Sequence, residues 1–338
     1  DAAARPVDVM DAADSAGAAG AAGAVGAAPR LIRPCRFLTG GDAECRLLRR
    51  RQLRRQMLAR RQSSAPLESR WPLRELSVQM PPMQGVELDL QAMPYQIQVA
   101  LVFLRGFNPR VQVPDAQAAA LPPLLPAPEA RHAGRRTLVL DLDETLVHCH
   151  PTLIAGAPPP ELELRIEETT PPLHAHVYLR PFARHFLQAA ARAFEVAIFT
   201  ASAAIYADRV VDFLDPDHEY VTHRLYRQHC TEMCGGHFKD MRRLGRQLDN
   251  VILVDNSPLA AGLTPESAIV VSSWFGDAPE DIELLHLLDV LDECAAGESV
   301  LAFLARRYGF AAFLEEQRAA AAAHDEAVRQ AAAAAAAA

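Results

Sequence analysis

The sequence places two aspartates at the point where a short apolar run ends. Leu138, Val139 and Leu140 form a run that is too short for a helix and apolar on both faces, which is typical of a strand buried in a parallel sheet. Asp141 and Asp143 follow directly, and residues two apart in a strand point the same way. Open α/β sheets bind ligands beyond the carboxyl ends of their strands, so both carboxylates are expected to share one crevice.

Two neighbouring carboxylates permit a narrow range of chemistry. One can attack as a nucleophile while the other transfers a proton. Like charges this close need a cation or a shared proton between them, which predicts Mg²⁺ as the cofactor. The competing interpretation is a solvated strand end on which two aspartates occur by chance.

The composition predicts one folded domain with extensions at both ends. Of 338 residues 50% are hydrophobic, but alanine supplies much of that figure. We expect the domain over residues 135–315, after a largely disordered, low-complexity and Arg-rich arm at 1–134 that ends in a Pro- and Ala-rich linker at 114–130. Residues 316–338 are expected to be an Ala-rich tail. A chain that lacks residues 1–130 should therefore keep its chemistry.

Two parts of the arm differ in what they indicate. Residues 45–61 are Arg-rich with apolar residues at rough helical spacing, which indicates a basic helix. It is either a solvated charged face or a patch for nuclear import or an acidic surface. Residues 71–113 contain apolar segments interrupted by prolines and give no assignment.

Charge and cysteine content limit the partners and the compartment. A net charge of -8 argues against direct nucleic-acid binding by the domain, and no apolar stretch of about 18 residues predicts a transmembrane helix. The six irregularly spaced cysteines favour reduced thiols in an intracellular compartment. We expect a monomeric domain in the nucleus, with the cytoplasm or the nuclear envelope surface as alternatives. Asp8, Asp11 and Asp14 make a mitochondrial transit peptide less favoured.

Residues 150–271 show strands alternating with helices. A proline-rich insert at 150–175 contains a short alternating piece that suits a small hairpin beside the site. The alternation predicts an α/β fold with a parallel, doubly wound sheet. The expected strands are 177–179, 196–199, 251–254 and 269–271, and the expected helices are 181–193 and 204–214.

Polar residues follow three of the expected strands. Asp141 and Asp143 follow the strand at 138–140. Thr200 and Ser202 follow the strand at 196–199, and Asp255 and Asn256 follow the strand at 251–254. An Asp-Asn pair after a single strand is usually only a turn. Three such ends in one parallel sheet meet at the same edge, which favours a site there.

Lys239 is the only lysine among 34 basic residues. A bias that replaces lysine by arginine elsewhere should remove this one too, unless arginine fails at that position. A tight anionic pocket that accepts a compact ammonium but not a guanidinium fork is such a place. Chance survival is the alternative.

Several segments carry a resemblance to a known family over about 170 residues. Asp141-Leu-Asp-Glu-Thr-Leu-Val-His resembles the Asp-x-Asp-x-Thr signature of haloacid-dehalogenase-type phosphatases. The chain is similar to the small phosphatases of the RNA polymerase II carboxyl-terminal domain (CTD), nearest the small-phosphatase-like type. The supporting segments are Tyr178-Leu-Arg-Pro-Phe, Phe199-Thr-Ala-Ser, Tyr206-Ala-Asp, Leu225-Tyr-Arg-Gln-His-Cys, Lys239-Asp, Leu244-Gly-Arg, Val254-Asp-Asn-Ser-Pro and Ser273-Trp-Phe.

The resemblance implies a role for each residue of the predicted site. Asp141 would be the nucleophile that forms an aspartyl-phosphate, and Asp143 the general acid and base. The expected Mg²⁺ ligands are the Asp141 carboxylate, the Asp143 carbonyl and Asn256, with Asp255 holding a metal-bound water. Substrate contacts are expected from Thr200, Ser202, Lys239, Arg227 and Tyr206. The substrate would be a phosphorylated protein, the CTD or another.

Other interpretations remain open. His229, Cys230, Cys234 and His237 form a cluster that could hold zinc, although the spacing is not that of a standard finger. His148, Cys149 and His150 are interpreted as packing or pocket-wall residues, and Trp274 and Phe275 as packing. The chain could also be a non-catalytic binding module of the same fold, like relatives in mitochondrial import, or a scaffold whose arms do the work.

Overall fold

The fold is described from a computed structural model, which covers residues 95–337 except 296 and 298. The Arg-rich segment at 45–61 and most of the predicted arm lie outside these described residues.

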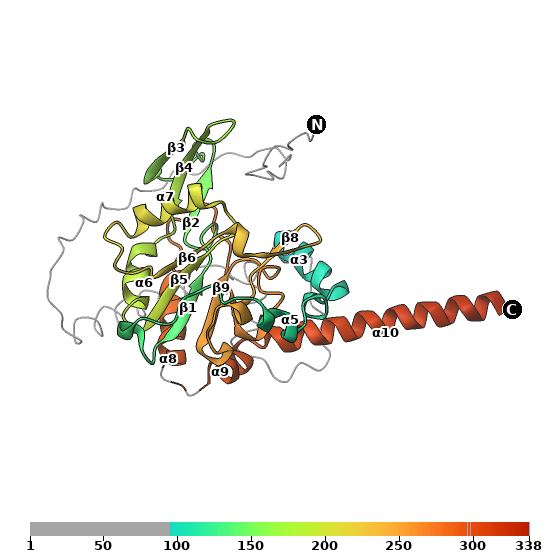
Figure 1. The fold of residues 1–338 in the computed structure, drawn as a ribbon. Helices are drawn as coiled ribbons and strands as arrows, with labels where there is room; N and C mark the ends of the chain where they lie inside the picture. The colour runs from blue at the N-terminus through green and yellow to red at the C-terminus, as the bar shows by residue number, and fades with distance from the viewer. Residues whose placement is uncertain (1–94, 296, 298, 338) are drawn as a thin grey trace, which may run out of the picture. The chain divides into compact units, whose positions relative to one another are not determined.

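Five parallel strands form the central sheet in the order β10-β9-β1-β5-β6 (Figure 1). This arrangement confirms the predicted parallel, doubly wound α/β sheet, with β1 in the middle. Residues 177–179, which were expected among its strands, belong instead to a separate antiparallel sheet. Both neighbours of β1 run parallel to it, so the three strands end at one edge. The strands are β1 (Arg136–Leu140), β5 (Phe194–Phe199), β6 (His223–Leu225), β9 (Val251–Asp255) and β10 (Ala268–Val270).

Successive side chains of the central strands point to opposite faces of the sheet, and each face is buried by a different hydrophobic cluster. Leu138 and Leu140 of β1 belong to the hydrophobic cluster on the first face, together with Phe186 and Val210. Since side chains alternate along a strand, Val139 points to the opposite face. Four helices supply the first cluster: α6 (Ala183–Ala190), α7 (Ala204–Leu214), α8 (Glu283–Ala295) and α9 (Val300–Arg307).

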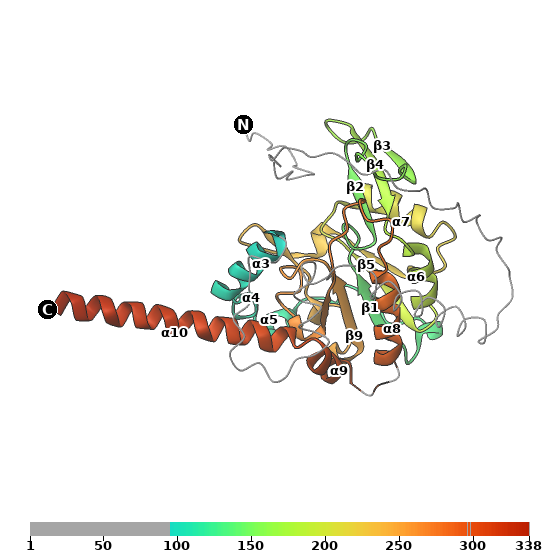
Figure 2. The ribbon, with the colours of Figure 1, turned by 180° about the vertical axis from the view of Figure 1, so that it is seen from behind.

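The second face is covered by the two ends of the described chain. Helix α3 (Tyr95–Gly106) packs beside the start of α10 (Phe310–Ala337), as Figure 2 shows from behind. Leu104 of α3 is fully buried in this second cluster with Val139 and Leu253 of the sheet. The domain therefore does not begin near Arg135 as predicted, because its second layer requires residues of α3.

The expected linker at 114–130 is also wrong. Short helices α4 (Pro109–Gln112) and α5 (Asp115–Ala120) and the 3-10 turn η3 (Ala130–His132) occupy this part of the chain. The Asn108 side chain accepts a hydrogen bond from Arg110 N and caps α4, whose first residue is a proline. The prolines that suggested a linker thus delimit short, packed helices.

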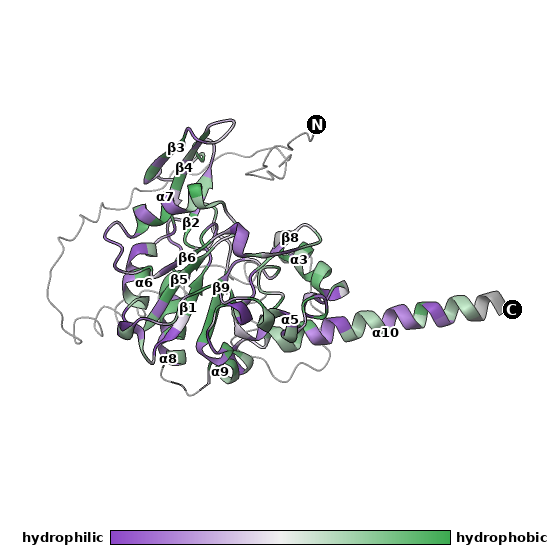
Figure 3. Ribbon diagram, viewed as in Figure 1, coloured by the Kyte–Doolittle hydropathy of each residue, from purple (hydrophilic) through white to green (hydrophobic). Residues whose placement is uncertain are grey.

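Helix α10 is anchored at its start and exposed along most of its length. Phe310, Phe313 and Leu314 are buried, whereas the residues from Glu315 to Ala333 are exposed or half-buried. Hydrophilic and hydrophobic residues alternate along this helix, while the central strands are largely hydrophobic (Figure 3). The predicted tail is therefore helical, since alanine is the strongest helix former. Within the described residues, no helix has the length and apolarity required to cross a bilayer.

The insert beside the site is larger than the predicted hairpin. Its three antiparallel strands run in the order β2-β4-β3 and follow β1 directly. A second small sheet, β7-β8, precedes Lys239. The remaining elements are β2 (Val147–His150), β3 (Leu162–Ile166), β4 (Leu173–Leu179), η4 (Arg227–His229), β7 (Thr231–Met233), β8 (Gly236–Phe238), η5 (Met241–Arg243), η6 (Leu248–Asn250) and η7 (Pro265–Ser267).

Candidate active site at the carboxyl edge of the sheet

Asp141 continues β1 by one residue beyond the sheet. Its backbone N–H donates to the Val254 carbonyl at 2.9 Å, which extends the pairing with β9. The residue is 6% exposed, so its carboxylate lies at the bottom of the site. The strand end therefore holds Asp141 where the sequence placed it.

Lys239 bridges two of the predicted acids. Its Nζ lies 2.6 Å from Asp141 Oδ1 and 2.6 Å from Asp255 Oδ2, and the residue is 1% exposed. Burial alone would lower the pKa of the ammonium, but the charges of Asp141 and Asp255 outweigh it and raise the pKa. The ammonium therefore stays charged, as a site that handles an anionic group requires.

Asp143 collects three hydroxyl groups from the β5 end and α7. Tyr206 Oη donates to Oδ1 at 2.5 Å, and Ser202 and Thr200 donate to Oδ2 at 2.8 and 3.4 Å. Burial, with the nearby charges of Glu144 and Asp141, raises the pKa of Asp143 to about 6, although the Tyr206 and Ser202 hydrogen bonds oppose this shift. A carboxyl group with this pKa can be protonated near neutral pH.

Thr145 and Ser273 are parts of the site that the sequence analysis did not identify. Thr145 Oγ1 donates to Asp141 Oδ2 at 2.9 Å and lies 3.4 Å from Asn256 Oδ1. Ser273 Oγ accepts from Asn256 Nδ2 at 3.0 Å, and the amide oxygen of Asn256 is directed toward Thr145. Thr145 is the last residue of the Asp-x-Asp-x-Thr signature, and Ser273 begins the segment Ser273-Trp-Phe that carries part of the family resemblance. Both residues could therefore have been found from the sequence.

A buried arginine fixes the turn that carries these acids. Arg180 is 1% exposed and donates to the carbonyls of Thr145 and Ser272 at 3.2 and 2.8 Å and to both oxygens of Asp281. Glu144 has a φ of 57°, a conformation that is uncommon for residues other than glycine. The hydrogen bonds of Arg180 thus stabilise the turn that follows Asp143.

The predicted substrate residues lie at different depths. Arg227 Nε donates to the Ala201 carbonyl at 2.6 Å, and Arg227 is half-buried next to Ser202. Tyr206 is 6% exposed and its hydroxyl is directed at Asp143. We expected Tyr206 near a substrate groove, but its contact is with a catalytic candidate.

The cysteine and histidine cluster does not form a metal site among the described residues. No group of three His, Cys, Asp or Glu side chains is arranged there to hold an ion. His229 Nδ1 accepts from the Tyr226 backbone N–H at 2.9 Å, and Cys230 Sγ lies 4.0 Å from the Thr200 carbonyl. These side chains pack the loop that follows β6.

His148 and Phe275 line a hollow beside the site. Their rings meet edge to face with centroids 5.6 Å apart, and His148 Nδ1 lies 3.0 Å from Glu144 Oε1. The hollow, of about 390 Å³, also includes His150. Trp274 is buried, as expected for packing, whereas Phe275 is 40% exposed.

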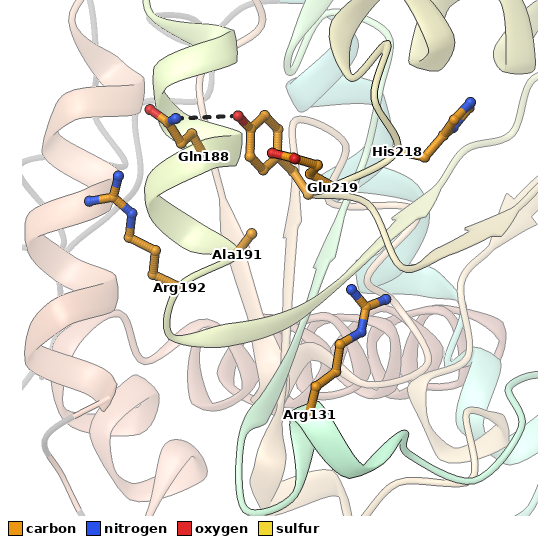
Figure 4. A pocket seen from close by; sticks show the side chains of 7 residues that line it. Arg131, Gln188, Ala191, Arg192, His218 and Glu219 are labelled. Carbon is orange, nitrogen blue, oxygen red and sulfur yellow. Dashed lines mark hydrogen bonds between the residues drawn. The ribbon is translucent and has the colours of Figure 1, made fainter. Parts of the chain in front are cut away.

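A larger hollow of about 540 Å³ lies away from the predicted site (Figure 4). The residues that line it precede β1, β5 and β6, so it lies at the amino edge of the sheet. None of them is a predicted site residue. They are Arg131, Gln188, Ala191, Arg192, His218, Glu219 and Tyr220.

The donor set at the carboxyl edge suits a hard divalent cation. Asp141 and Asp255 face one ammonium, and the pKa of Asp255 is raised by burial and by Asp141 despite the opposing charge of Lys239. The available ligands are carboxylate, amide and carbonyl oxygens, which Mg²⁺ prefers. The residues therefore fit the predicted ion, with Asp141 and Asn256 on one side of the crevice.

Fold and site together define a doubly wound α/β protein with acids and one lysine at the carboxyl edge of its sheet. Residues 136–301 match the family of NLI interacting factor-like phosphatases. The chain is 45% identical over 184 residues to a probable C-terminal domain small phosphatase of Dictyostelium discoideum, covering 53% of this chain and 55% of that protein. It is 39% identical over 192 residues to the CTD nuclear envelope phosphatase 1 of Xenopus tropicalis, covering 54% and 78%.

Among solved structures, that of Fcp1, an essential RNA polymerase II CTD phosphatase, aligns with a TM-score of 0.36 at 19% identity, over 50% of this chain and 52% of that one.

The sequence matches show that the chain belongs to the NLI interacting factor-like phosphatase family, as the sequence resemblance predicted. It spans about half the length of the Dictyostelium relative and more than three quarters of the Xenopus one.

Proposed function

We propose that the chain is a Mg²⁺-dependent protein phosphatase that hydrolyses phosphoserine or phosphothreonine through an aspartyl-phosphate on Asp141. The observation that carries the proposal is the Asp141 carboxylate, held between Lys239 Nζ at 2.6 Å and Thr145 Oγ1 at 2.9 Å. Asp143 lies two residues further on. The family supports phosphatase chemistry, since its relatives are named phosphatases.

In the first step, a carboxylate oxygen of Asp141 attacks phosphorus and the bond to the serine or threonine oxygen breaks. Asp143 gives its proton to the departing oxygen, which leaves as the free hydroxyl. A pKa of about 6 suits this role, because the group is partly protonated near neutral pH and becomes a base once it has lost the proton.

In the second step, water attacks the phosphorus of the aspartyl-phosphate. Asp143 takes a proton from that water, the bond between Asp141 and phosphorus breaks, and inorganic phosphate leaves. Both acids then return to their starting protonation states. One residue thus acts as acid and then as base.

The surrounding residues hold the phosphoryl group and Asp143 in place. Lys239 lies beside the attacking carboxylate, so its ammonium can neutralise a phosphoryl oxygen attached there. Ser202 and Tyr206 orient Asp143, and Thr200 contacts a phosphoryl oxygen. Arg227, at the rim, contacts the substrate from its terminal nitrogens.

The residues that would hold Mg²⁺ are the Asp141 carboxylate, the Asp143 carbonyl and the Asn256 amide oxygen, with Asp255 behind them. The bound ion would neutralise charge on the transferring phosphoryl group and allow it to approach two carboxylates.

The proposed substrate is a phosphorylated protein segment, the RNA polymerase II CTD or another. Two relatives are named for the CTD, and one of these for the nuclear envelope, which supports the nucleus or its envelope as the location. The insert strands β2, β3 and β4 border the site and would meet the residues that flank the phosphate.

The experiment is phosphate release from a phosphoserine CTD peptide by the full chain, in saturating Mg²⁺ and in excess EDTA. We expect turnover in Mg²⁺ and its loss in EDTA. Asn256→Ala should raise the Mg²⁺ concentration needed for half-maximal rate, whereas Asn250→Ala, exposed at the other edge of the sheet, should not. Equal rates with and without EDTA would refute the metal assignment. Tight binding of the peptide without phosphate release would favour a binding module instead.

A further inference from the structure

Residues 95–125, here called the amino-terminal brace, lie outside the segment that matches the family but pack beside the catalytic lysine. The family match begins at residue 136. Ile97, Leu101 and Leu104 of α3 are buried in the cluster that contains Phe238 and Met241, the residues on either side of Lys239 and Asp240. The brace and the lysine loop thus share one hydrophobic core.

An arginine connects the brace to the residue next to Lys239. Arg242 donates to the Val113 carbonyl at 3.0 Å and to Asp115 Oδ1 at 2.7 Å, both in the brace. The same guanidinium donates to both oxygens of Asp240 at 2.8 and 2.7 Å. Asp240 is 1% exposed, so its charge is compensated inside the protein rather than by solvent.

Two further contacts join the brace to the same loop. Leu124 N–H donates to the Arg243 carbonyl at 2.7 Å. Gly245 has a φ of 71°, and a Cβ on it would lie 2.8 Å from Pro123 Cβ, so the proline ring packs directly against the glycine backbone. The brace therefore follows the loop from residue 240 to residue 245.

The position of this loop decides where the ammonium lies. Lys239 backbone N–H donates to the Ala260 carbonyl at 2.8 Å, and Nζ reaches Asp141 and Asp255 at 2.6 Å each. The side chain is fully enclosed and its Nζ is 5.8 Å from the centre of the Phe199 ring. Because both contacts are short and the side chain is enclosed, a displacement of the loop moves the ammonium away from the acids.

We propose that the amino-terminal brace positions Lys239 for phosphoryl transfer, acting through the contacts of Arg242 with Val113, Asp115 and Asp240. Arg242 is a positioning residue and touches no substrate. This proposal rests on the proposed function, since it assigns the lysine a catalytic role. It predicts that loss of the Arg242 contacts lowers the rate of the chemical step and leaves binding of a small substrate unchanged.

The test is a double-mutant cycle in the full chain, with kcat and KM measured on p-nitrophenyl phosphate in saturating Mg²⁺. Arg242→Ala should lower kcat by roughly 10- to 100-fold, the effect of a small displacement of a catalytic group, with little change in KM. In the Lys239→Ala background, the same substitution should lower kcat less than twofold, because the group it positions is gone. Arg242→Lys, which keeps the charge but loses the fork, should fall between Arg242→Ala and wild type.

Arg246→Ala is the matched control for stability. Its side chain is 7% exposed, against 9% for Arg242, and its guanidinium donates to both oxygens of Glu195 at the other edge of the sheet. It also donates to the carbonyls of Pro126 and Gly245, but it makes none of the contacts with Val113, Asp115 and Asp240 on which the proposal rests. It should lower the unfolding midpoint and leave kcat unchanged. If Arg242→Ala does not fold, Asp115→Ala, which removes an exposed partner of the same guanidinium, replaces it in the cycle with a smaller expected loss.

Two results would overturn the proposal that the amino-terminal brace positions Lys239. One is an unchanged kcat in folded Arg242→Ala, and the other is an equal loss of kcat in the wild-type and Lys239→Ala backgrounds. A wild-type rate for Lys239→Ala alone would instead refute the proposed role of the lysine, so the two failures are distinct.

Discussion

Two buried carboxylate sites lie at opposite ends of the same parallel strands. At the amino edge, Glu195 accepts from Arg246 at 2.9 and 2.7 Å and from Thr137 at 2.8 Å, and its Oε1 is 2.9 Å from His223 Nε2. Burial alone would raise the pKa of Glu195, but these partners, led by Arg246, lower it to about 2. This carboxylate is fully compensated and stabilises the fold.

The carboxyl edge has the opposite balance. Asp141 and Asp255 share the single ammonium of Lys239, whereas Asp143 receives only hydroxyl donors, and burial with neighbouring acids raises the pKa of Asp143 to about 6. An under-compensated charge destabilises the folded state. The comparison teaches that the same sheet can compensate a buried acid fully and that it does not do so at the carboxyl edge. This difference agrees with the proposed function, which requires acids that bind a cation and exchange protons.

The largest expected effect is on turnover at the carboxyl edge. Asp141→Asn should lower kcat by at least about a thousandfold, because the amide cannot attack phosphorus. The amide is nearly isosteric, so the unfolding midpoint should stay close to that of wild type. Phosphate release from a phosphopeptide measures the first quantity, and thermal unfolding the second. A wild-type rate would remove Asp141 from the mechanism.

The next effect tests whether charge alone suffices at Lys239. Lys239→Arg should lose nearly as much activity as Lys239→Ala, about a hundredfold, because a longer planar fork cannot occupy an enclosed site with two contacts at 2.6 Å. The comparison requires saturating Mg²⁺, so that loss of the ion is not mistaken for loss of the ammonium. Turnover of Lys239→Arg within a few-fold of wild type would mean that the lone lysine is an accident of composition.

A third effect concerns stability at the amino edge. Glu195→Gln should lower the free energy of unfolding at pH 7 by roughly 3 kcal/mol, since the pKa of Glu195 is about 2 in the folded protein and 4.5 in its ordinary state. A carboxyl whose pKa is lowered stabilises fully above pH 4.5, and this contribution is lost as the pH falls toward 2. The difference between wild type and Glu195→Gln in urea unfolding should therefore shrink from pH 7 to pH 3. Turnover at pH 7 should be unchanged in the folded variant.

The strand ends and the lysine could be predicted from the sequence for clear reasons. A short run that is apolar on both faces identifies a buried strand, and parallel strands bring Asp141, Thr200 and Asp255 to one edge. Lys239 was visible because arginine replaces every other lysine. These signals lie in the residue types themselves and do not depend on distant partners.

The brace could not be predicted because its partners are distant in sequence. Leu104 belongs to the same hydrophobic cluster as Phe238 and Met241, which are more than 130 positions away in the sequence, and prolines obscure the helical periodicity of residues 107–125. The composition resembled a linker for that reason. Whether a short helix is buried depends on the surface against which it packs, and the local sequence alone does not predict that surface.

Contacts of single polar side chains were also hidden. Thr145 and Ser273 act through hydrogen bonds across the crevice, and hydroxyl residues occur in loops for many reasons. Glu195, the second residue of β5, carries a buried charge that Arg246 and His223 compensate only once the chain has folded. Tyr206 was placed beside the substrate by resemblance, while its hydrogen bond to Asp143 required the structure.

The free energy of unfolding of Asp143→Asn in EDTA at pH 7, set beside that of Glu195→Gln, tests the contrast between the two edges most directly. The same acid-to-amide change should act in opposite directions, because the pKa of Asp143 is raised by burial and that of Glu195 is lowered by its partners. Without Mg²⁺ Asp143 is compensated only by hydroxyl groups, which do not outweigh its burial, so its destabilising effect is greatest above pH 6 and disappears as the pH falls toward 3.8. We predict that Asp143→Asn is as stable as wild type or more stable, and that Glu195→Gln is clearly less stable. A loss of stability in Asp143→Asn as large as that in Glu195→Gln would contradict the account.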